Sequence, residues 1–202
     1  KTDQEEAGVA LARAKSEVER LTREAAVAET RRLEASEGLH PLRNTEAVAF
    51  QMKEAFDEIL PETVEVHNIG ASSPDTIMGY DFLIFGIPTW NTGELQDDCD
   101  AFLPNFKEMK MDGKKLAIFG LGDQNGYGYN FLAAVGILAD EAMLAGADVY
   151  GLWSDNAYEY NESKAKVEEY FLGLGIDVEG QSEKTPERIK IWAQEVKTEF
   201  GL

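Results

Sequence analysis

The sequence has 202 residues, of which 44% are hydrophobic and 28% are charged, and this is enough for one well-buried core with an appendage. Its 38 acidic and 19 basic side chains give a formal net charge of -19, which repels nucleic acid and anionic lipid and favours a basic protein partner. The alternative is that the acidity serves only to keep the protein in solution. A single cysteine excludes an intrachain disulfide, the two histidines complete no zinc or iron–sulfur motif, and no apolar run approaches the roughly 20 residues of a membrane span.

The first predicted element is one long helix over residues 1–37, a stretch without proline or aromatic residues that is rich in Ala, Glu, Arg and Leu. Its apolar seam is narrow and mostly alanine, which favours docking on another protein or on its own domain over self-dimerisation. The chain begins with Lys1, so we interpret it as a processed form or an incomplete sequence. We divide it into a helical extension, residues 1–37, and a globular domain, residues 38–202.

Gly38 and Pro41 end the first helix, and a second helix begins near Asn44 and ends before Pro61. Apolar alternation predicts a short strand after it, and two continuous apolar runs predict buried parallel strands further on. The later elements are a strand over 63–69, a turn over 72–74, strands over 81–87 and 115–121, helices over 99–106 and 130–145, a strand over 148–153, an irregular excursion over 153–180 and a closing helix over 186–200. Alternating strands and helices indicate an open α/β sheet with helices on both faces.

Two loops stand at the predicted carboxyl ends of neighbouring strands, where open α/β sheets bind their ligands. The first is Pro88–Asp98 and the second is Gly122–Phe131. Together with Gly136–Leu138 and Tyr158–Ala165, these loops make the chain from about Asn44 to Leu202 resemble a long-chain flavodoxin. The resemblance covers about three quarters of the sequence and implies a flavodoxin-like fold.

The resemblance also implies a site for FMN, in which the flavin ring stacks between Trp90 of the first loop and Tyr127 of the second. Negative charge nearby, from residues such as Asp97, Asp98 and Asp123, would disfavour the anionic reduced flavin and give a low-potential electron donor. The predicted cofactor-binding residues are Thr89, Trp90, Asn91, Thr92, Gly93, Gly122, Asp123, Tyr127, Asn130, Asn44 and Thr45. Neither a catalytic residue nor a metal ligand is predicted.

The sequence departs from the family in front of Asn44. Where a hydrophobic first strand and a Ser/Thr-rich phosphate loop are expected, residues 31–37 have no strand character, and Gly38–Arg43 contains no serine or threonine. In the flavodoxin-like strand order 2-1-3-4-5, the missing strand is the central one. We therefore predict a sheet reduced to four strands, with the segment 63–69 paired anew or dropped from it.

Our first interpretation is a structural or docking subunit of a photosynthetic electron-transfer complex, of the photosystem I type, with FMN binding lost or weakened. Its expected partner has a basic docking face, on photosystem I or a reductase, and its expected location is the chloroplast, in the stroma or on the stromal face of the thylakoid. The helix from Asp3 to Glu34 would be its anchor. The alternative is a working FMN-binding, low-potential electron carrier; a quinone-reductase-like enzyme is a third interpretation, with less support from the loops.

Overall fold

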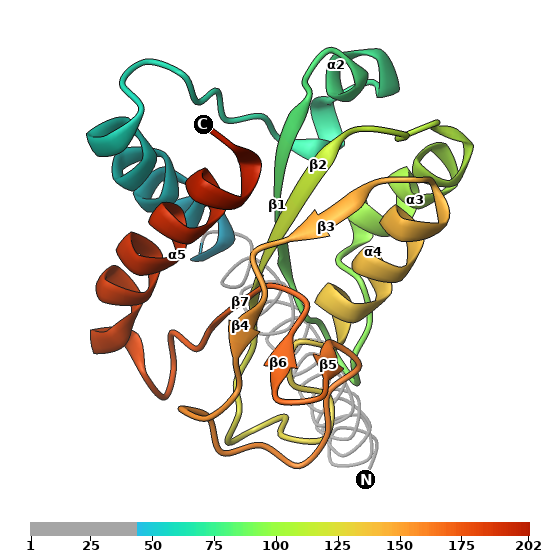
Figure 1. Ribbon diagram of the computed structural model, residues 1–202. Helices are drawn as coiled ribbons and strands as arrows, with labels where there is room; N and C mark the ends of the chain where they lie inside the picture. Colours follow the sequence, from blue (N-terminus) through green and yellow to red (C-terminus); the bar gives the residue numbers. More distant parts are fainter. Residues whose placement is uncertain (1–43) are drawn as a thin grey trace, which may run out of the picture. The chain divides into compact units, whose positions relative to one another are not determined.

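The computed structural model describes residues 44–202 (Figure 1). The predicted helical extension, residues 1–37, and the segment Gly38–Arg43 lie outside the described residues, so the boundary between the two predicted domains stays a prediction. Within the described part, no helix combines the length and the apolar character needed to cross a bilayer.

The central sheet has four parallel strands (Figure 1): β1 (Phe82–Pro88), β2 (Lys115–Leu121), β3 (Asp148–Tyr150) and β7 (Leu174–Ile176). β1 pairs with the whole length of β2. β3 and β7 pair in succession with the other edge of β2, the first with residues 115–117 and the second with residues 119–121. The predicted four-stranded sheet is confirmed, with its last two strands sharing one position.

The excursion between β3 and β7 is more regular than the sequence predicted. It contains a small antiparallel sheet of β4 (Trp153–Ser154), β6 (Tyr170–Phe171) and β5 (Lys166–Val167), in that order across the sheet. The Tyr158 side chain joins this excursion to the central sheet, because its hydroxyl donates a hydrogen bond of 2.6 Å to the Gly175 carbonyl. Burial raises the pKa of Tyr158 to about 12, so the hydroxyl keeps the proton that it donates.

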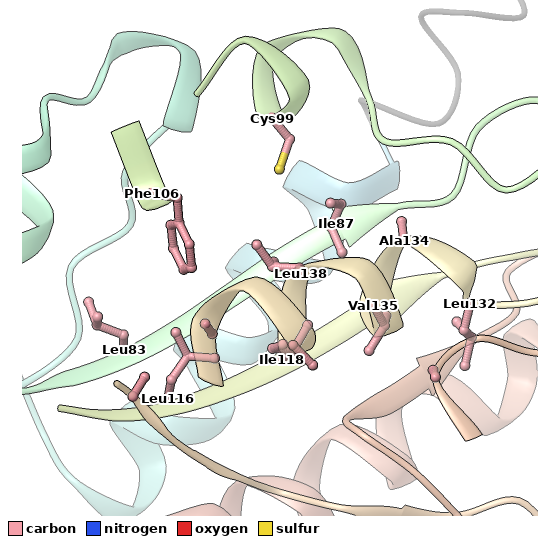
Figure 2. Packing of buried hydrophobic residues seen from close by; sticks show 14 of the residues in the cluster. Leu83, Ile87, Cys99, Phe106, Leu116, Ile118, Leu132, Ala134, Val135 and Leu138 are labelled. Atoms are coloured by element: carbon pink, nitrogen blue, oxygen red, sulfur yellow. The ribbon is translucent and has the colours of Figure 1, made fainter. Parts of the chain in front are cut away.

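Two layers of helices cover the central sheet. α3 (Asp97–Glu108) and α4 (Ala133–Leu144) pack on one face, and the helix over 44–59 and α5 (Thr185–Phe200) pack on the other. Side chains of β2 alternate between the faces: Leu116 and Ile118 join the first cluster, and Ala117 and Phe119 join the second. Figure 2 shows the first cluster, where Leu138 of α4 lies over the strands. Burial on both faces explains why these strands are continuous apolar runs.

The predicted strand over residues 63–69 is wrong. Residues 63–68 belong to no strand, and the chain continues into the 3-10 turn η1 (Ile69–Ala71) and α2 (Pro74–Met78), where only a turn was predicted. The sequence predicted that this segment would either pair with a new neighbour or leave the sheet, and it leaves the sheet. The physical reason is that an alternating pattern needs a neighbouring strand, and within residues 44–202 the only strand that pairs with β1 is β2.

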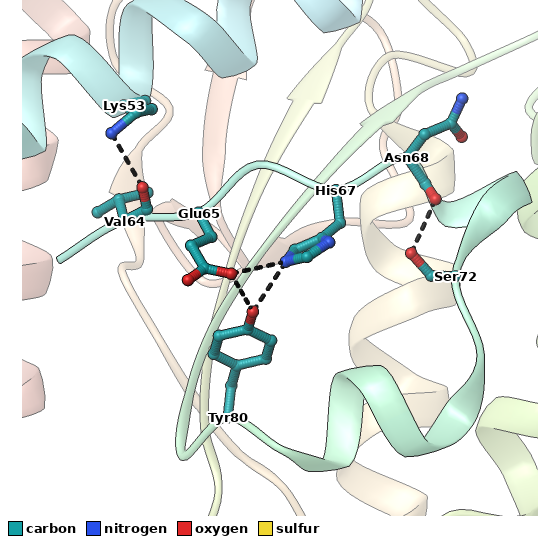
Figure 3. Close-up of polar contacts among 7 residues, drawn as sticks. All are labelled: Lys53, Val64, Glu65, His67, Asn68, Ser72 and Tyr80. Carbon is teal, nitrogen blue, oxygen red and sulfur yellow. Dashed lines mark hydrogen bonds and ion pairs between the residues drawn. The ribbon is translucent and has the colours of Figure 1, made fainter. Parts of the chain in front are cut away.

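Side chains hold the dropped segment in place of a β-ladder (Figure 3). The Lys53 ammonium donates to the Val64 carbonyl at 2.9 Å, and the Tyr80 hydroxyl donates to the Glu65 carboxylate at 2.6 Å. The same hydroxyl lies 2.8 Å from Nε2 of His67. The hydrogen bond from Tyr80 lowers the pKa of Glu65 and raises that of Tyr80, because it favours the charged carboxylate and the neutral phenol. These contacts fix the approach of the chain to β1.

Candidate functional site

The first loop begins where β1 ends and folds into a tight turn. The Thr89 amide donates to the Leu121 carbonyl at 2.9 Å, which ties the loop to the end of β2. Trp90 and Glu94 then exchange two backbone hydrogen bonds of 3.0 and 2.9 Å. Asn91 and Gly93 between them have positive φ angles of 46° and 94°, a conformation that asparagine and glycine tolerate. The turn holds the half-buried Trp90 at its base and leaves Thr92 exposed.

The indole of Trp90 carries an unusual feature for a partly buried side chain. Its Nε1–H is inaccessible to solvent and has no hydrogen-bond partner among residues 44–202. Buried N–H groups are almost always paired, so an orphaned one marks either a strained position or a position completed by a group from outside the chain. Ring stacking, the role predicted for Trp90, uses the face of the indole and does not pair this in-plane N–H, so the orphaned donor does not by itself identify a ligand.

The second loop follows β2 and is shaped by Asp123. Its Oδ1 accepts hydrogen bonds from the amides of Asn125 and Gly126 at 2.9 and 2.8 Å. Its carbonyl accepts from the Tyr127 amide at 3.0 Å, and the Tyr127 carbonyl accepts from the Asn130 amide at 2.9 Å. These bonds keep the backbone folded while the Tyr127 side chain remains 57% exposed. The loop therefore offers an aromatic surface to solvent from a fixed backbone.

The two loops lie against each other at the start of α4. A Cβ atom placed on Gly93 would lie 3.0 Å from Oδ1 of Asn130, so the backbone of one loop passes directly beside a side chain of the other. The Ala134 amide points to the Thr89 hydroxyl, with 3.4 Å between the two atoms. The structure thus brings Thr89, Gly93 and Asn130 together at the start of α4. The Gly122 amide donates instead to the Ile176 carbonyl at 3.0 Å, which ties the beginning of the second loop to β7.

Asn44 and Thr45 occupy the first described turn of the helix over 44–59, and both are half-buried. Each of them has an interaction partner. A cavity of about 210 Å³ lies between this turn and the start of α5, with Asn44, Val48 and Thr185 among the residues that line it. The sequence predicts that the helix begins near Asn44, and the first amides and the dipole of a helix attract the negative charge of a phosphate group.

Two of the acidic residues predicted to supply negative charge lie where the first loop meets α3. Asp97 and Asp98 are the last residues of the first loop and are exposed in the first turn of α3. Cys99 beside them is buried, and desolvation, with the charges of Asp100 and Asp98, raises the pKa of its thiol to about 11. Within the described residues, no group of three or more His, Cys, Asp or Glu side chains is arranged to hold a metal ion.

Comparison with known proteins gives these loops a context. The family model described as "Flavodoxin" matches residues 42–192. A flavodoxin of Trichodesmium erythraeum is 42% identical over 159 residues, which are 78% of this chain and 92% of that protein. The chain belongs to the flavodoxin family. A second relative, flavodoxin 1 of Salmonella typhimurium, is 38% identical over 79% of this chain and 89% of its own length.

Solved structures agree with this assignment. The Fusobacterium nucleatum flavodoxin bound to flavin mononucleotide superposes with a TM-score of 0.72 and 27% identity, over 77% of this chain and 90% of the other. Oxidised flavodoxin 2 from Bacillus cereus gives a TM-score of 0.61 and 26% identity, over 78% and 92% of the two chains. The resemblance predicted from the two loops is therefore confirmed. Flavodoxins are electron-transfer carriers, which agrees with the prediction of a carrier or a structural protein instead of an enzyme.

Sequence reasoning missed two residues that hold the second loop of this flavodoxin-family chain. Gln124 and Asp177 are 4% and 0% exposed, and Nε2 of Gln124 donates to Oδ2 of Asp177 at 2.7 Å. A polar residue among Gly, Asn and Asp reads as ordinary loop composition, so Gln124 gave no signal. Asp177 directly follows the apolar Gly175–Ile176 pair, a position where burial is expected, and that was the signal available.

Proposed function

We propose that this protein is an FMN-binding, low-potential electron carrier. The observation that carries the proposal is the pair of adjoining loops at the carboxyl ends of β1 and β2, which supply Trp90 and Tyr127 from fixed backbones. The half-buried indole of Trp90 and the exposed ring of Tyr127 fit a planar ligand that both side chains contact. The family membership favours this carrier over a docking subunit that has lost FMN, which was our first interpretation.

FMN supplies reversible electron transfer when it is bound. The residues of this chain would hold its ring by dispersion and offset aromatic contact through Trp90 and Tyr127, and its phosphate at the helix start that carries Asn44 and Thr45. The exposed carboxylates of Asp97 and Asp98 add negative charge near the first loop, which favours a low reduction potential. The half-buried position of Trp90 also keeps water away from one side of the ring.

We further propose that the partner is photosystem I or a reductase with a basic docking face, and that the protein works in a chloroplast. Two facts support this extension: the net charge of -19, which attracts a basic surface, and the cyanobacterial origin of relatives such as the Trichodesmium erythraeum flavodoxin. The helix predicted over Asp3–Glu34 is the proposed anchor to that partner. A docking role without FMN remains the second candidate, favoured by the single strand neighbour of β1 within residues 44–202.

The test is an FMN titration followed by quenching of flavin fluorescence. The proposal expects saturable binding at micromolar concentration or tighter, weakened roughly tenfold or more by Trp90→Ala or by Tyr127→Ala through the loss of a stacked ring. Tyr129→Ala is the matched control, because Tyr129 is an aromatic residue of the same loop that is 69% exposed. Unchanged affinity is expected for that control.

Two outcomes would count against the carrier. Absence of binding at high micromolar FMN would favour the docking subunit, which native electrophoresis of a cell extract would then show migrating within a large complex. Equal losses in all three variants would show that binding depends on general loop stability and not on ring contact by Trp90 and Tyr127.

A further inference from the structure

Asp177 is the most deeply buried charged side chain of the described residues that the proposed function has not used. It follows β7 directly and is 0% exposed. Its Oδ1 accepts the amide hydrogens of Glu179 and Gly180 at 3.1 and 2.8 Å. Within residues 44–202, no lysine, arginine or histidine forms an ion pair with it. A buried, unpaired carboxylate is unfavourable unless hydrogen bonds compensate it, so its bonds indicate what it does.

The second carboxylate oxygen of Asp177 accepts hydrogen bonds from the loop that carries Tyr127. Oδ2 accepts from Nε2 of Gln124 at 2.7 Å and from the Gln124 amide at 3.3 Å. Gln124 in turn accepts the Glu159 amide on Oε1 at 2.6 Å. Through Gln124, the Asp177 carboxylate therefore connects the end of β7, the second loop and the excursion. Gln124 is 53 residues before Asp177 and 35 residues before Glu159.

These contacts fix the second loop on one side of Tyr127, and a second set fixes it on the other. The Gly128 carbonyl accepts the amides of Asn161 and Glu162 at 2.9 and 3.0 Å. Tyr127 lies between the two anchors, Gln124 and Gly128, and its own side chain is exposed. The direction in which its ring points therefore depends on the backbone at both anchors.

We propose that Asp177 is a positioning residue of the flavin site, which acts through Gln124 to hold the Tyr127 ring where FMN stacks. The proposal rests on the proposed function, because it assigns Asp177 to the site that binds FMN. A carboxylate suits the position since each of its oxygens accepts two N–H groups, whereas an amide side chain offers one accepting oxygen. Asp177→Asn is isosteric, and its oxygen can still serve Glu179 and Gly180 while its Nδ2 faces the donors of Gln124.

The experiment measures FMN affinity in the full chain for four proteins: wild type, Asp177→Asn, Gln124→Glu and the double variant. Asp177→Asn places the new Nδ2 donor against the N–H donors of Gln124, and Gln124→Glu places a second carboxylate against Asp177. Each single change is expected to weaken FMN binding roughly tenfold. In the double variant, the new carboxylate of residue 124 accepts from the amide of residue 177, so most of the affinity should return. Met111→Ala is the control for general destabilisation, because Met111 is 0% exposed and lies beside the amino end of β2, away from both loops.

Amide hydrogen exchange of the FMN-free proteins provides a readout that does not require the ligand. Asp177→Asn should accelerate exchange in residues 122–131 and leave α4 unchanged. Affinity equal to wild type in Asp177→Asn, or no recovery in the double variant when both single variants fold, would overturn the inference and leave the carrier intact. Wild-type protein that fails to bind FMN would instead refute the proposed function, and with it any flavin role of Asp177.

Discussion

Gly136→Ala tests whether α4 and the excursion are in direct backbone contact. A Cβ atom on Gly136 would lie 2.3 Å from the Lys164 carbonyl oxygen and 2.7 Å from the Ala165 nitrogen. Inside a helix, replacing glycine by alanine normally stabilises by about 1 kcal/mol. Overpacking of a tight contact costs about 1–3 kcal/mol, and the upper part of that range applies here because backbone atoms cannot rotate away. The net expectation is a loss of about 1–2 kcal/mol.

Thermal unfolding monitored by circular dichroism measures the effect, and for a chain of this size the expected loss lowers the melting temperature by about 2–8 °C. Asp140, which is exposed in the same helix, provides the control. Asp140→Ala should be more stable than Asp140→Gly by about 1 kcal/mol, because no packing opposes the helix preference there. A Gly136→Ala protein as stable as wild type, alongside a normal Asp140 pair, would refute the close contact.

Three further predictions concern single side chains. Burial raises the pKa of the Cys99 thiol to about 11, so at pH 8 it should react with iodoacetamide roughly a hundred times more slowly than a thiol of the ordinary pKa 9.0. Equal reaction rates in native and urea-unfolded protein would contradict this. Trp192→Phe should cost about 1–3 kcal/mol in urea unfolding, because the fully buried indole donates to the Gly151 carbonyl at 2.8 Å; a cost below about 0.5 kcal/mol would show that the cavity collapses. A hydrogen bond from Lys166 lowers the pKa of Asp155 below its ordinary value of 3.8, so this carboxylate contributes stability above pH 3.8 that is lost as the pH falls further. Asp155→Asn should flatten the acid limb of the stability profile below pH 4, and an unchanged limb would exclude this contribution.

The parallel strands could be predicted from sequence because burial on both faces leaves a plain signal. The runs 81–87 and 115–121 became β1 and β2 with a shift of one residue at most. The start of α4 was predicted three residues early, since Leu132 adopts a left-handed conformation with φ of 56° that its residue type does not suggest. The segment 63–69 failed for another reason: alternation shows that a segment can form a strand, whereas pairing depends on a neighbour elsewhere in the fold.

The adjacency of the two loops could be predicted because loops after parallel strands gather at one edge of a sheet. That rule places the loop of Trp90 beside the loop of Tyr127 without any knowledge of side-chain contacts. It does not reveal the supports of the loops, because the partners of Gln124 are a residue 53 positions later and another 35 positions later. Long-range polar pairs of this kind have no periodicity, and they become visible only when burial and hydrogen bonds are known.

The interrupted edge of the central sheet links the fold to the site. β3 and β7 share one edge of β2, and the chain between them makes the excursion. Every long-range anchor described for the second loop comes from this region: the Ile176 carbonyl and Asp177 at the end of β7, and the amides of Glu159, Asn161 and Glu162 in the excursion. A continuous strand over the same edge would leave Gly128 and Oε1 of Gln124 without these donors. Two short strands, β3 and β7, therefore replace one long strand at this edge, and the chain between them supplies the hydrogen bonds that fix the loop of Tyr127.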